Sequence, residues 1–220
     1  PKLALALLQK HARGAAKLVI KPINSVNNII PELLQATGPT RSLMLYTDAR
    51  NFVLSTLKKG EGGKQTIRSM FDLIRCDFPH LQNLQLTHTI HMTDLRIIMT
   101  LWRLQIEQAQ AAIQQTSSDS PMASLYGEKL IDHPLEALQA ANQFLDLGIS
   151  LEEIESIANS DERFADAKNE GQRFSKEKRA DTYRRLEEFY GGDLEDGLEW
   201  LTRNNPGAQL LPELGGALPV

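Results

Sequence analysis

The sequence predicts an all-α or mainly α fold, a multi-helix bundle built from helical hairpins. Apolar residues recur three or four positions apart through most of the 220 residues, which is the spacing of one helix face. Proline and glycine interrupt that spacing where helices are expected to end. A composition of 41% hydrophobic and 24% charged residues is typical of a globular protein with a sizeable core.

The first part of the chain is expected to be a basic helical half, residues 1–116. Its expected helices are amphipathic and end at proline or glycine; they cover residues 3–20, a short turn after Pro31, and residues 40–59 and 65–78. Thr40 is the expected N-cap of the helix at 40–59. Residues 60–63, Gly-Glu-Gly-Gly, are expected to form a flexible hinge.

The best-defined element is a central helix expected at residues 93–115, around which the basic half packs. Its apolar stripe consists of Leu95, Ile98, Trp102, Ile106, Ala109 and Ile113. Just before it, apolar and polar residues alternate over residues 84–92, which favours one short strand or an extended segment.

The second part is expected to be an acidic helical half, residues 120–204, after a serine-rich break at 116–121. Pro121 and Pro134 each stand where the first position of a helix is expected. Residues 205–220 are rich in proline and glycine, so a flexible tail or linker is expected there.

A helical hairpin is expected at residues 142–158. Ser150 and Glu153 form a capping-box pattern, which marks the start of its second helix. The segment has the outline of a DNA-binding helix-turn-helix. However, Phe144 occupies a position that should be small, and the glutamates of the second helix would repel phosphates. A hairpin of the same shape without DNA recognition is therefore favoured.

The last expected helices lie on either side of a glycine pair. Ser175 is expected to open a helix that runs to Tyr190 and ends at Gly191 and Gly192. Asp193 is then expected to cap another helix that ends near Asn204.

Charge is distributed unevenly along the chain. Residues 1–103 carry 14 Lys/Arg and 6 Asp/Glu, a net charge of +8, whereas residues 104–220 carry 10 and 22, a net charge of −12. Asymmetry of this size bears on partners rather than on the fold. Either the basic half meets an anionic surface elsewhere, or the two halves meet each other.

Three sets of charged residues are candidates for partner binding. The basic stripe runs along one side of the expected first helix and consists of Lys10, Arg13, Lys17 and Lys21. The second basic site surrounds the glycine-rich segment and consists of Lys58, Lys59, Lys64 and Arg68. The acidic face follows Ser150 and consists of Glu152, Glu153 and Glu155. Because like charges at helical spacing repel, the basic stripe is either solvated or bound to an acidic partner.

Neither a catalytic residue nor a metal or cofactor is expected. The stretch 60–66 resembles a phosphate-binding loop only superficially, because Gln65 stands where Ser or Thr should bind magnesium. The four possible zinc ligands have a spacing that matches no common structural zinc pattern; they are Cys76, His80, His88 and His91. The motifs of hydrolases, zinc proteases and dinucleotide-binding enzymes are absent from the sequence.

The favoured interpretation is a non-enzymatic protein–protein interaction module, such as an adaptor, regulator or assembly component. Its partner would be a protein of complementary charge or a second copy of this chain. The single Cys76 excludes an internal disulfide and favours a reducing, cytoplasmic compartment. A targeting role for the basic residues 1–21 is not favoured, because that stretch lacks serine.

Two alternatives stay open. One is a nucleic-acid-associated regulator that uses the basic N-terminal half. The other is a peripheral membrane-surface or host-directed protein whose first helix inserts into the interface, although that helix lacks Trp and Phe. No apolar run approaches the about 20 residues that are needed to cross a bilayer.

Overall fold

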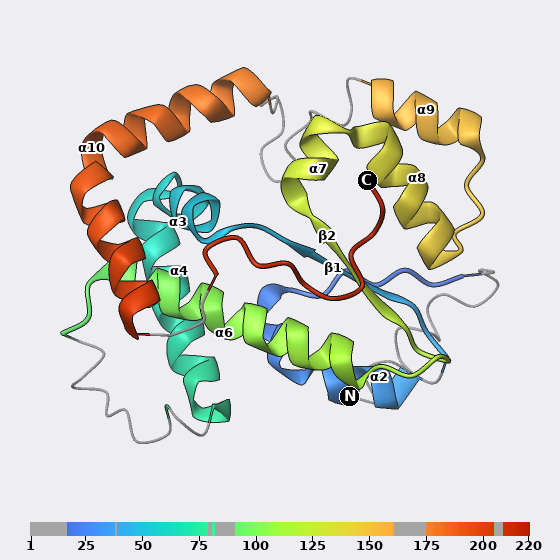
Figure 1. Cartoon of the computed structure of the whole chain (residues 1–220), viewed down its shortest axis with the longest axis horizontal. Coiled ribbons are helices and arrows are strands. Elements are labelled where there is room, and N and C mark those ends of the chain that lie inside the picture. Colours follow the sequence, from blue (N-terminus) through green and yellow to red (C-terminus); the bar gives the residue numbers. More distant parts are fainter. Residues whose placement is uncertain (1–16, 38, 79–80, 82–90, 161–174, 205–208) are drawn as a thin grey trace. The chain divides into compact units, whose positions relative to one another are not determined.

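The computed structural model confirms a mainly α fold with one small parallel sheet (Figure 1). It describes residues 17–37, 39–78, 81, 91–160, 175–204 and 209–220. The helices of this part are η1 (Asn24–Ile29), α2 (Ile30–Thr37), α3 (Ala49–Leu57), α4 (Gly60–Ile74), η2 (Arg75–Asp77), α6 (Asp94–Gln115), α7 (Gly127–Asp132), α8 (Pro134–Leu145), α9 (Leu151–Asn159) and α10 (Lys176–Asn204). The strands are β1 (Ser42–Tyr46) and β2 (Met122–Tyr126).

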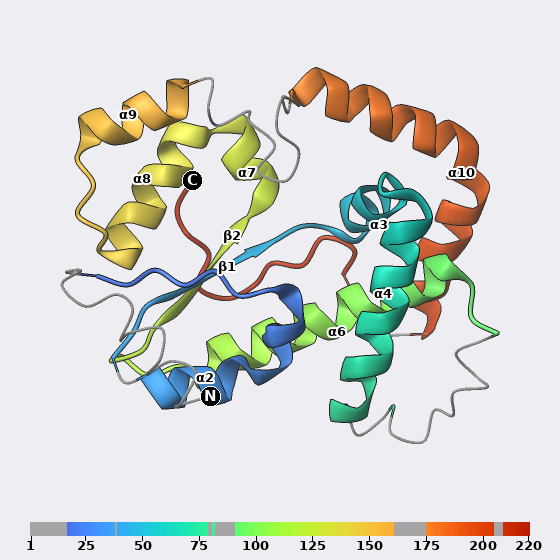
Figure 2. The same cartoon turned by 180° about the vertical axis from the view of Figure 1, so that it is seen from behind.

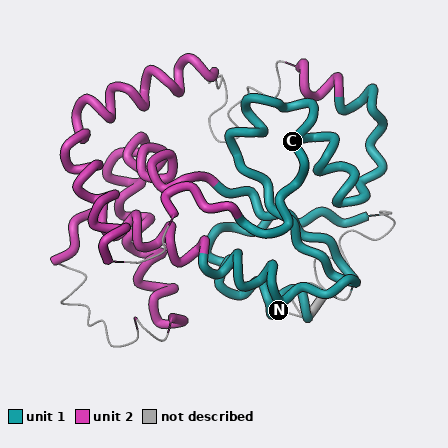
Figure 3. The backbone as a smooth tube through the Cα atoms, in the orientation of Figure 1, with its two compact units in different colours: residues 1–46, 107–154, 214–220 teal, residues 47–106, 155–213 magenta. Residues whose placement is uncertain are grey.

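The chain forms two compact units, coloured separately in Figure 3. Unit 1 consists of residues 1–46, 107–154 and 214–220, and unit 2 consists of residues 47–106 and 155–213. Each unit therefore combines segments of the expected basic half with segments of the expected acidic half.

Unit 1 contains the sheet. The two strands pair in parallel, with Ser42 opposite Met122 and Tyr46 opposite Tyr126. The rings of the two tyrosines lie 5.6 Å apart at their centroids. Parallel strands need a long crossover connection, and here that connection includes α3, α4 and α6.

The C-terminal segment of unit 1 lies alongside β2. The Ser124 N–H donates to the Gly216 carbonyl at 3.0 Å, and the Leu218 N–H donates to the Ser124 carbonyl at 2.9 Å. Gly216 has a φ of +64°, a conformation that favours glycine. Leu214 is only 4% exposed. The chain is therefore packed from Leu214 onward, which differs from the expected tail.

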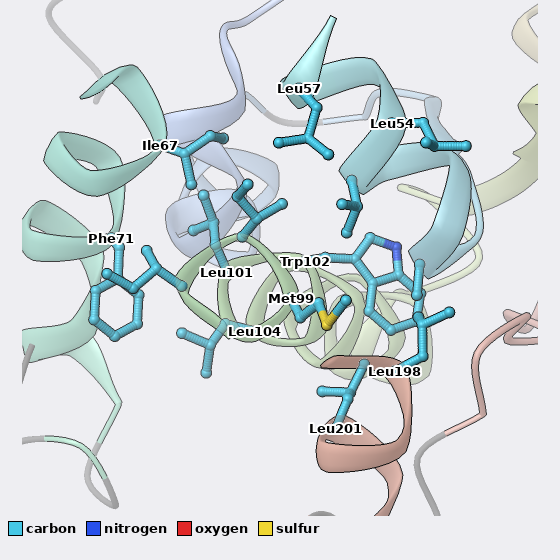
Figure 4. Close-up of a cluster of buried hydrophobic side chains, with 14 of the residues drawn as sticks. Leu54, Leu57, Ile67, Phe71, Met99, Leu101, Trp102, Leu104, Leu198 and Leu201 are labelled. Carbon is cyan, nitrogen blue, oxygen red and sulfur yellow. The ribbon is translucent and has the colours of Figure 1, made fainter. Parts of the chain in front are cut away.

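Unit 2 is a helical cluster around the first part of α6 (Figure 4). In the part of α6 that belongs to unit 2, the side chains that are at most 1% exposed are Ile97, Ile98, Met99, Leu101 and Leu104. The Trp102 indole N–H donates to the Thr47 carbonyl at 2.8 Å, which satisfies the polar atom of a buried ring. The predicted central helix is thereby confirmed as a core helix, and α3, α4 and α10 supply the side chains around it.

Close helix packing in unit 2 depends on two glycines. A Cβ atom at Gly63 of α4 would lie 2.5 Å from the Thr56 carbonyl oxygen. A Cβ atom at Gly197 of α10 would lie 2.7 Å from the Met99 Cε atom. Real Cβ atoms do not approach other heavy atoms this closely, so a larger residue at either position would force a neighbour to move.

The helix expected at 40–59 is wrong in its first part. Ser42–Tyr46 forms β1, and α3 begins only at Ala49. Asp48 is the N-cap, because its carboxylate accepts a hydrogen bond from the Asn51 N–H at 2.8 Å. The partner of β1 lies far along the chain, and short apolar runs do not distinguish a strand from a helix by periodicity.

Two further boundaries differ from the prediction at glycine and proline. The expected hinge at 60–63 is the first turn of α4, where only Gly60 has a positive φ of 60°. Pro121 precedes β2 instead of opening a helix, because the apolar stretch after it pairs with β1. Pro134 does occupy the first position of α8, as predicted.

The glycine pair at 191–192 does not end a helix, and Asp193 does not cap one. Helix α10 continues through all three residues and bends near its middle (Figure 1 and Figure 2). A glycine inside a helix destabilises it by about 0.5–1 kcal/mol relative to alanine. Burial of Leu194 and Leu198, which are at most 4% exposed, outweighs that loss of helix stability.

The helix expected at 3–20 is wrong over residues 17–20, which are not helical. Residues 1–16 lie outside the described part of the chain, as do residues 84–90 of the expected strand and residues 205–208 of the expected tail. The short helical turn expected after Pro31 is confirmed as part of α2.

Candidate interaction surfaces

The basic stripe is not assembled on a helix in the described part of the chain. Lys10 and Arg13 lie outside that part, and Lys21 is exposed. The Lys17 ammonium lies 3.0 Å from the Asp146 carboxylate, just after α8. The hydrogen bond from Lys17 lowers the pKa of Asp146. One member of the stripe therefore meets an acidic residue within the same unit.

Arg41 reaches the same end of α8, and the sequence analysis did not single it out. Its guanidinium donates to the Phe144 carbonyl at 2.8 Å. A cation at the C-terminal end of a helix is favourable, because the last carbonyls of the helix carry partial negative charge. Spacing along the chain could not reveal this contact, since the two residues are 103 positions apart.

The second basic site is partly neutralised inside unit 2. Arg68 Nε donates to the Asp94 carboxylate at 2.7 Å, and Arg68 Nη2 donates to the Met92 carbonyl at 3.1 Å. Lys64 lies 2.7 Å from the Glu61 carboxylate and 3.8 Å from that of Asp94. The hydrogen bond to Glu61 raises the pKa of Lys64. These two cations therefore join α4 to the start of α6.

The other two members of the second basic site, Lys58 and Lys59, follow α3 and are exposed. Within the predicted set, Lys64 and Arg68 therefore contact carboxylates on α4 and α6, and Lys58 and Lys59 lie in the turn between α3 and α4. An anionic ligand at this site would compete with Asp94 for Arg68.

The predicted helical hairpin is confirmed as α8, a turn and α9. Its turn contains two residues in the left-handed region, Asp146 with a φ of 53° and Gly148 with a φ of 73°. The Asn142 side chain holds the turn, because its amide donates to the Ile149 carbonyl at 2.9 Å and its oxygen accepts from the Ile149 N–H at 3.1 Å. The conformation of the turn is therefore held by hydrogen bonds local to the hairpin.

The predicted capping box is confirmed at the start of α9. The Glu153 N–H donates to Ser150 Oγ at 3.2 Å, and the Ser150 N–H donates to Glu153 Oε2 at 3.0 Å. The Ser150 hydroxyl also donates to Glu153 Oε2 at 2.9 Å. The backbone hydrogen bond from Ser150, followed by the hydroxyl bond, lowers the pKa of Glu153. Glu153 thus has a structural role besides its place in the acidic face.

The acidic face occupies the exposed sides of α9. This helix has only two buried residues, Ile154 and Ala158, at 4% and 3% exposure. The boundary between the two units falls inside it, after position 154. Within the described residues, neither Glu152 nor Glu155 has an ion pair, and both are exposed.

Two exposed apolar residues accompany these glutamates on α9. Leu151 is 55% exposed and Ile157 is 46% exposed. The whole hairpin, residues 134–159, contains five Asp/Glu and no Lys, Arg or His. Its only cationic contacts among the described residues come from outside the hairpin, at the end of α8.

The residues considered for metal binding do not come together where they can be described. Cys76 and His91 are exposed, and His80 and His88 lie outside the described part. Among the residues that are placed, no group of three or more His, Cys, Asp or Glu could hold a metal ion.

Within the same residues, no helix combines the length and the apolar character needed to cross a membrane. Comparison with protein-family models, with curated proteins and with solved structures finds no match to this chain.

Proposed function

We propose that this chain is a non-enzymatic protein–protein interaction module whose acidic face binds a partner segment that carries Lys or Arg beside apolar residues. The observation that supports this proposal most directly is the composition of α9 and its hairpin. Glu152 and Glu155 are exposed without an ion pair in the described residues, and no basic residue occurs in residues 134–159.

The neighbouring apolar side chains give this surface a source of affinity. Leu151 and Ile157 expose about half of their surface on a helix that only Ile154 and Ala158 anchor. Burial of apolar side chains supplies most of the affinity of protein interfaces, whereas charge mainly supplies steering and specificity. A partner helix or extended segment with alternating basic and apolar residues would satisfy both features.

The alternative of a nucleic-acid-associated regulator has less support among the described residues. Arg68 and Lys64 already contact Asp94, so phosphate binding there would have to break ion pairs within unit 2. Lys17 likewise contacts Asp146. These contacts lower the gain from releasing counterions, which drives binding of basic surfaces to nucleic acid.

The experiment that tests the proposal is affinity purification with quantitative mass spectrometry at low and at high salt. The test variant is Glu152→Lys with Glu155→Lys, which reverses the acidic face and leaves the Ser150–Glu153 capping box intact. The control variant is Asp119→Lys with Glu213→Lys, because both residues are exposed and lie outside α9. It applies the same change of net charge away from the proposed surface.

We expect the test variant to lose at least one salt-sensitive protein partner that the wild type and the control retain. A basic peptide derived from that partner should then bind the purified wild-type chain and not the test variant. Identical protein partners for all three chains would contradict the proposal. A salt-dependent gel shift with nucleic acid, unaffected by the test variant, would favour the alternative.

A further inference from the structure

The side of α10 that faces away from the core of unit 2 carries four exposed residues, which we term the outer face. They are Arg185, Phe189, Gly192 and Asp196. At about 100° per residue, these four lie opposite the helix side that buries Leu194, Leu198 and Leu201. Phe189 is 79% exposed, more than any other large apolar residue in the described part of the chain.

The glycine of the outer face lies where α10 bends and leaves its side of the helix open. A Cβ atom at Gly192 would meet no heavy atom within 4 Å, and its φ is not positive. Gly197 of the same helix differs, because Met99 occupies the space where its Cβ atom would lie. Gly192 therefore leaves a gap in the surface of α10, large enough for a side chain of another molecule to approach the helix backbone.

The outer face is complementary to itself. Along the chain the spacings from Arg185 to Phe189 to Gly192 to Asp196 are four, three and four residues, which is a symmetric order. Reversing that order exchanges arginine with aspartate and phenylalanine with glycine. A surface with this property matches a copy of itself that runs in the opposite direction.

We propose that two copies of this chain associate through an antiparallel crossing of their α10 helices at the outer face. The two-fold axis would pass between positions 190 and 191. Phe189 would then lie opposite Gly192 of the partner subunit, and Arg185 opposite Asp196 of the partner subunit. Each of these contacts occurs twice because the interface is isologous. The proposal concerns a surface separate from the acidic face and does not rest on the proposed function.

In this proposed contact, the Phe189 ring of one copy fits into the gap at Gly192 of the other. Gly192 has no side chain, so the helix backbone of one copy can receive the Phe189 ring of the other. Aromatic side chains in such gaps are typical anchors of protein interfaces. Arg185 contacts Asp181 of its own helix at 2.8 Å, and exposed pairs of this kind contribute little, so the arginine can exchange partners.

The bend of α10 limits the contact to the middle of the helix. Arg50 of α3 donates to both Glu187 and Glu195, which lie on either side of the glycine pair. Helix α10 therefore curves around α3, and its outer face is convex (Figure 1). The ends of two such helices diverge from the crossing. An interface this short is small, which predicts a weak dimer that depends on concentration.

Sedimentation equilibrium over a range of micromolar concentrations tests the proposal with the intact chain. The wild type should show a monomer–dimer equilibrium. Arg185→Asp places two carboxylates opposite each other across the axis, and Asp196→Arg places two guanidinium groups there. Each variant alone should weaken dimerisation by at least about tenfold. An equimolar mixture of the two variants restores both opposite-charge pairs, so it should form a heterodimer.

The mixture separates this proposal from a general loss of stability, because two damaged proteins would not recover dimerisation on mixing. Arg184→Asp is the matched control, since this arginine is exposed on the same helix but off the outer face. We expect it to dimerise as the wild type does. A wild type that stays monomeric at every concentration would overturn the proposal. So would variants that dimerise normally, or a mixture that does not recover.

Discussion

Helices α9 and α10 both belong to the acidic part of the sequence, but they use their charges differently. Helix α9 and its hairpin carry only acidic charges, and Glu152 and Glu155 have no ion pair in the described residues. Helix α10 carries six Lys/Arg and eight Asp/Glu. Many of these pair along the helix, as Arg184 does with Asp181 and Glu188.

This difference shows that the net charge of half the sequence is a poorer guide to possible partners than the charges carried by each individual helix. The exposed glutamates of α9 have no ion pair in the described residues, which is the basis of the proposed basic partner. The outer face of α10 carries both signs in symmetric order, which is the basis of the proposed self-association.

The largest effect is expected where α10 meets the core of unit 2. Gly197→Leu would place a side chain in the space occupied by Met99, because even a Cβ atom would lie 2.7 Å from Met99 Cε. Overpacking of this kind typically destabilises a protein by about 1–3 kcal/mol. We expect a fall of that size in the free energy of unfolding, measured by urea denaturation. An unchanged denaturation midpoint would show that α10 does not pack on α6 as described.

A smaller effect is expected at the start of α9. Ser150→Ala removes the hydroxyl that accepts the Glu153 N–H, and loss of an N-cap costs about 1 kcal/mol. Hydrogen exchange of the α9 amides should become faster, while the amides of α10 should not change. Ser150→Thr, which keeps a hydroxyl, is the matched control and should preserve most of the protection. If the α9 amides of Ser150→Ala exchanged at the same rate as those of the wild type, the capping role would be contradicted.

Gly192→Ala distinguishes the stability of the folded chain from the proposed dimer contact at the outer face of α10. Because no atom lies within 4 Å of the added Cβ, the alanine should stabilise the folded chain by about 0.5–1 kcal/mol. The same methyl group would fill the gap that receives Phe189 of the partner subunit, so dimerisation should weaken. Thermal unfolding and sedimentation measure the two effects separately. A variant that is more stable and dimerises equally well would place the dimer contact elsewhere.

The sequence predicted several local features of this fold and missed the non-local ones. The central helix, the first position of α8 at Pro134 and the Ser150–Glu153 capping box depend on residues close in the chain, and they were found. The β1–β2 pair was missed because each strand is five residues long and its partner is distant. The Arg68–Asp94 contact was missed because it joins two helices, so spacing within either helix carries no sign of it.

The glycine pair of α10 shows a different limit of sequence analysis. Gly191 and Gly192 have the composition of a helix end, and only the burial of leucines after them reveals that the helix continues. Local preference and tertiary packing conflicted here, and packing prevailed. The residues of the acidic face are exposed, and their binding to a partner stays a prediction. The basic sites were predicted without the carboxylates that contact Lys17, Lys64 and Arg68.

The smallest expected effect is the pH dependence of the α9 cap. Hydrogen bonds from Ser150 lower the pKa of Glu153 in the folded chain below its unfolded value. The stabilising contribution is therefore fully present above the unfolded pKa and is lost as the pH falls through the folded pKa. Amide exchange of α9, corrected for the intrinsic rate, should lose protection as the pH falls through that range. Glu153→Gln should remove this pH dependence while Glu152→Gln retains it, because only Glu153 accepts the Ser150 hydrogen bonds.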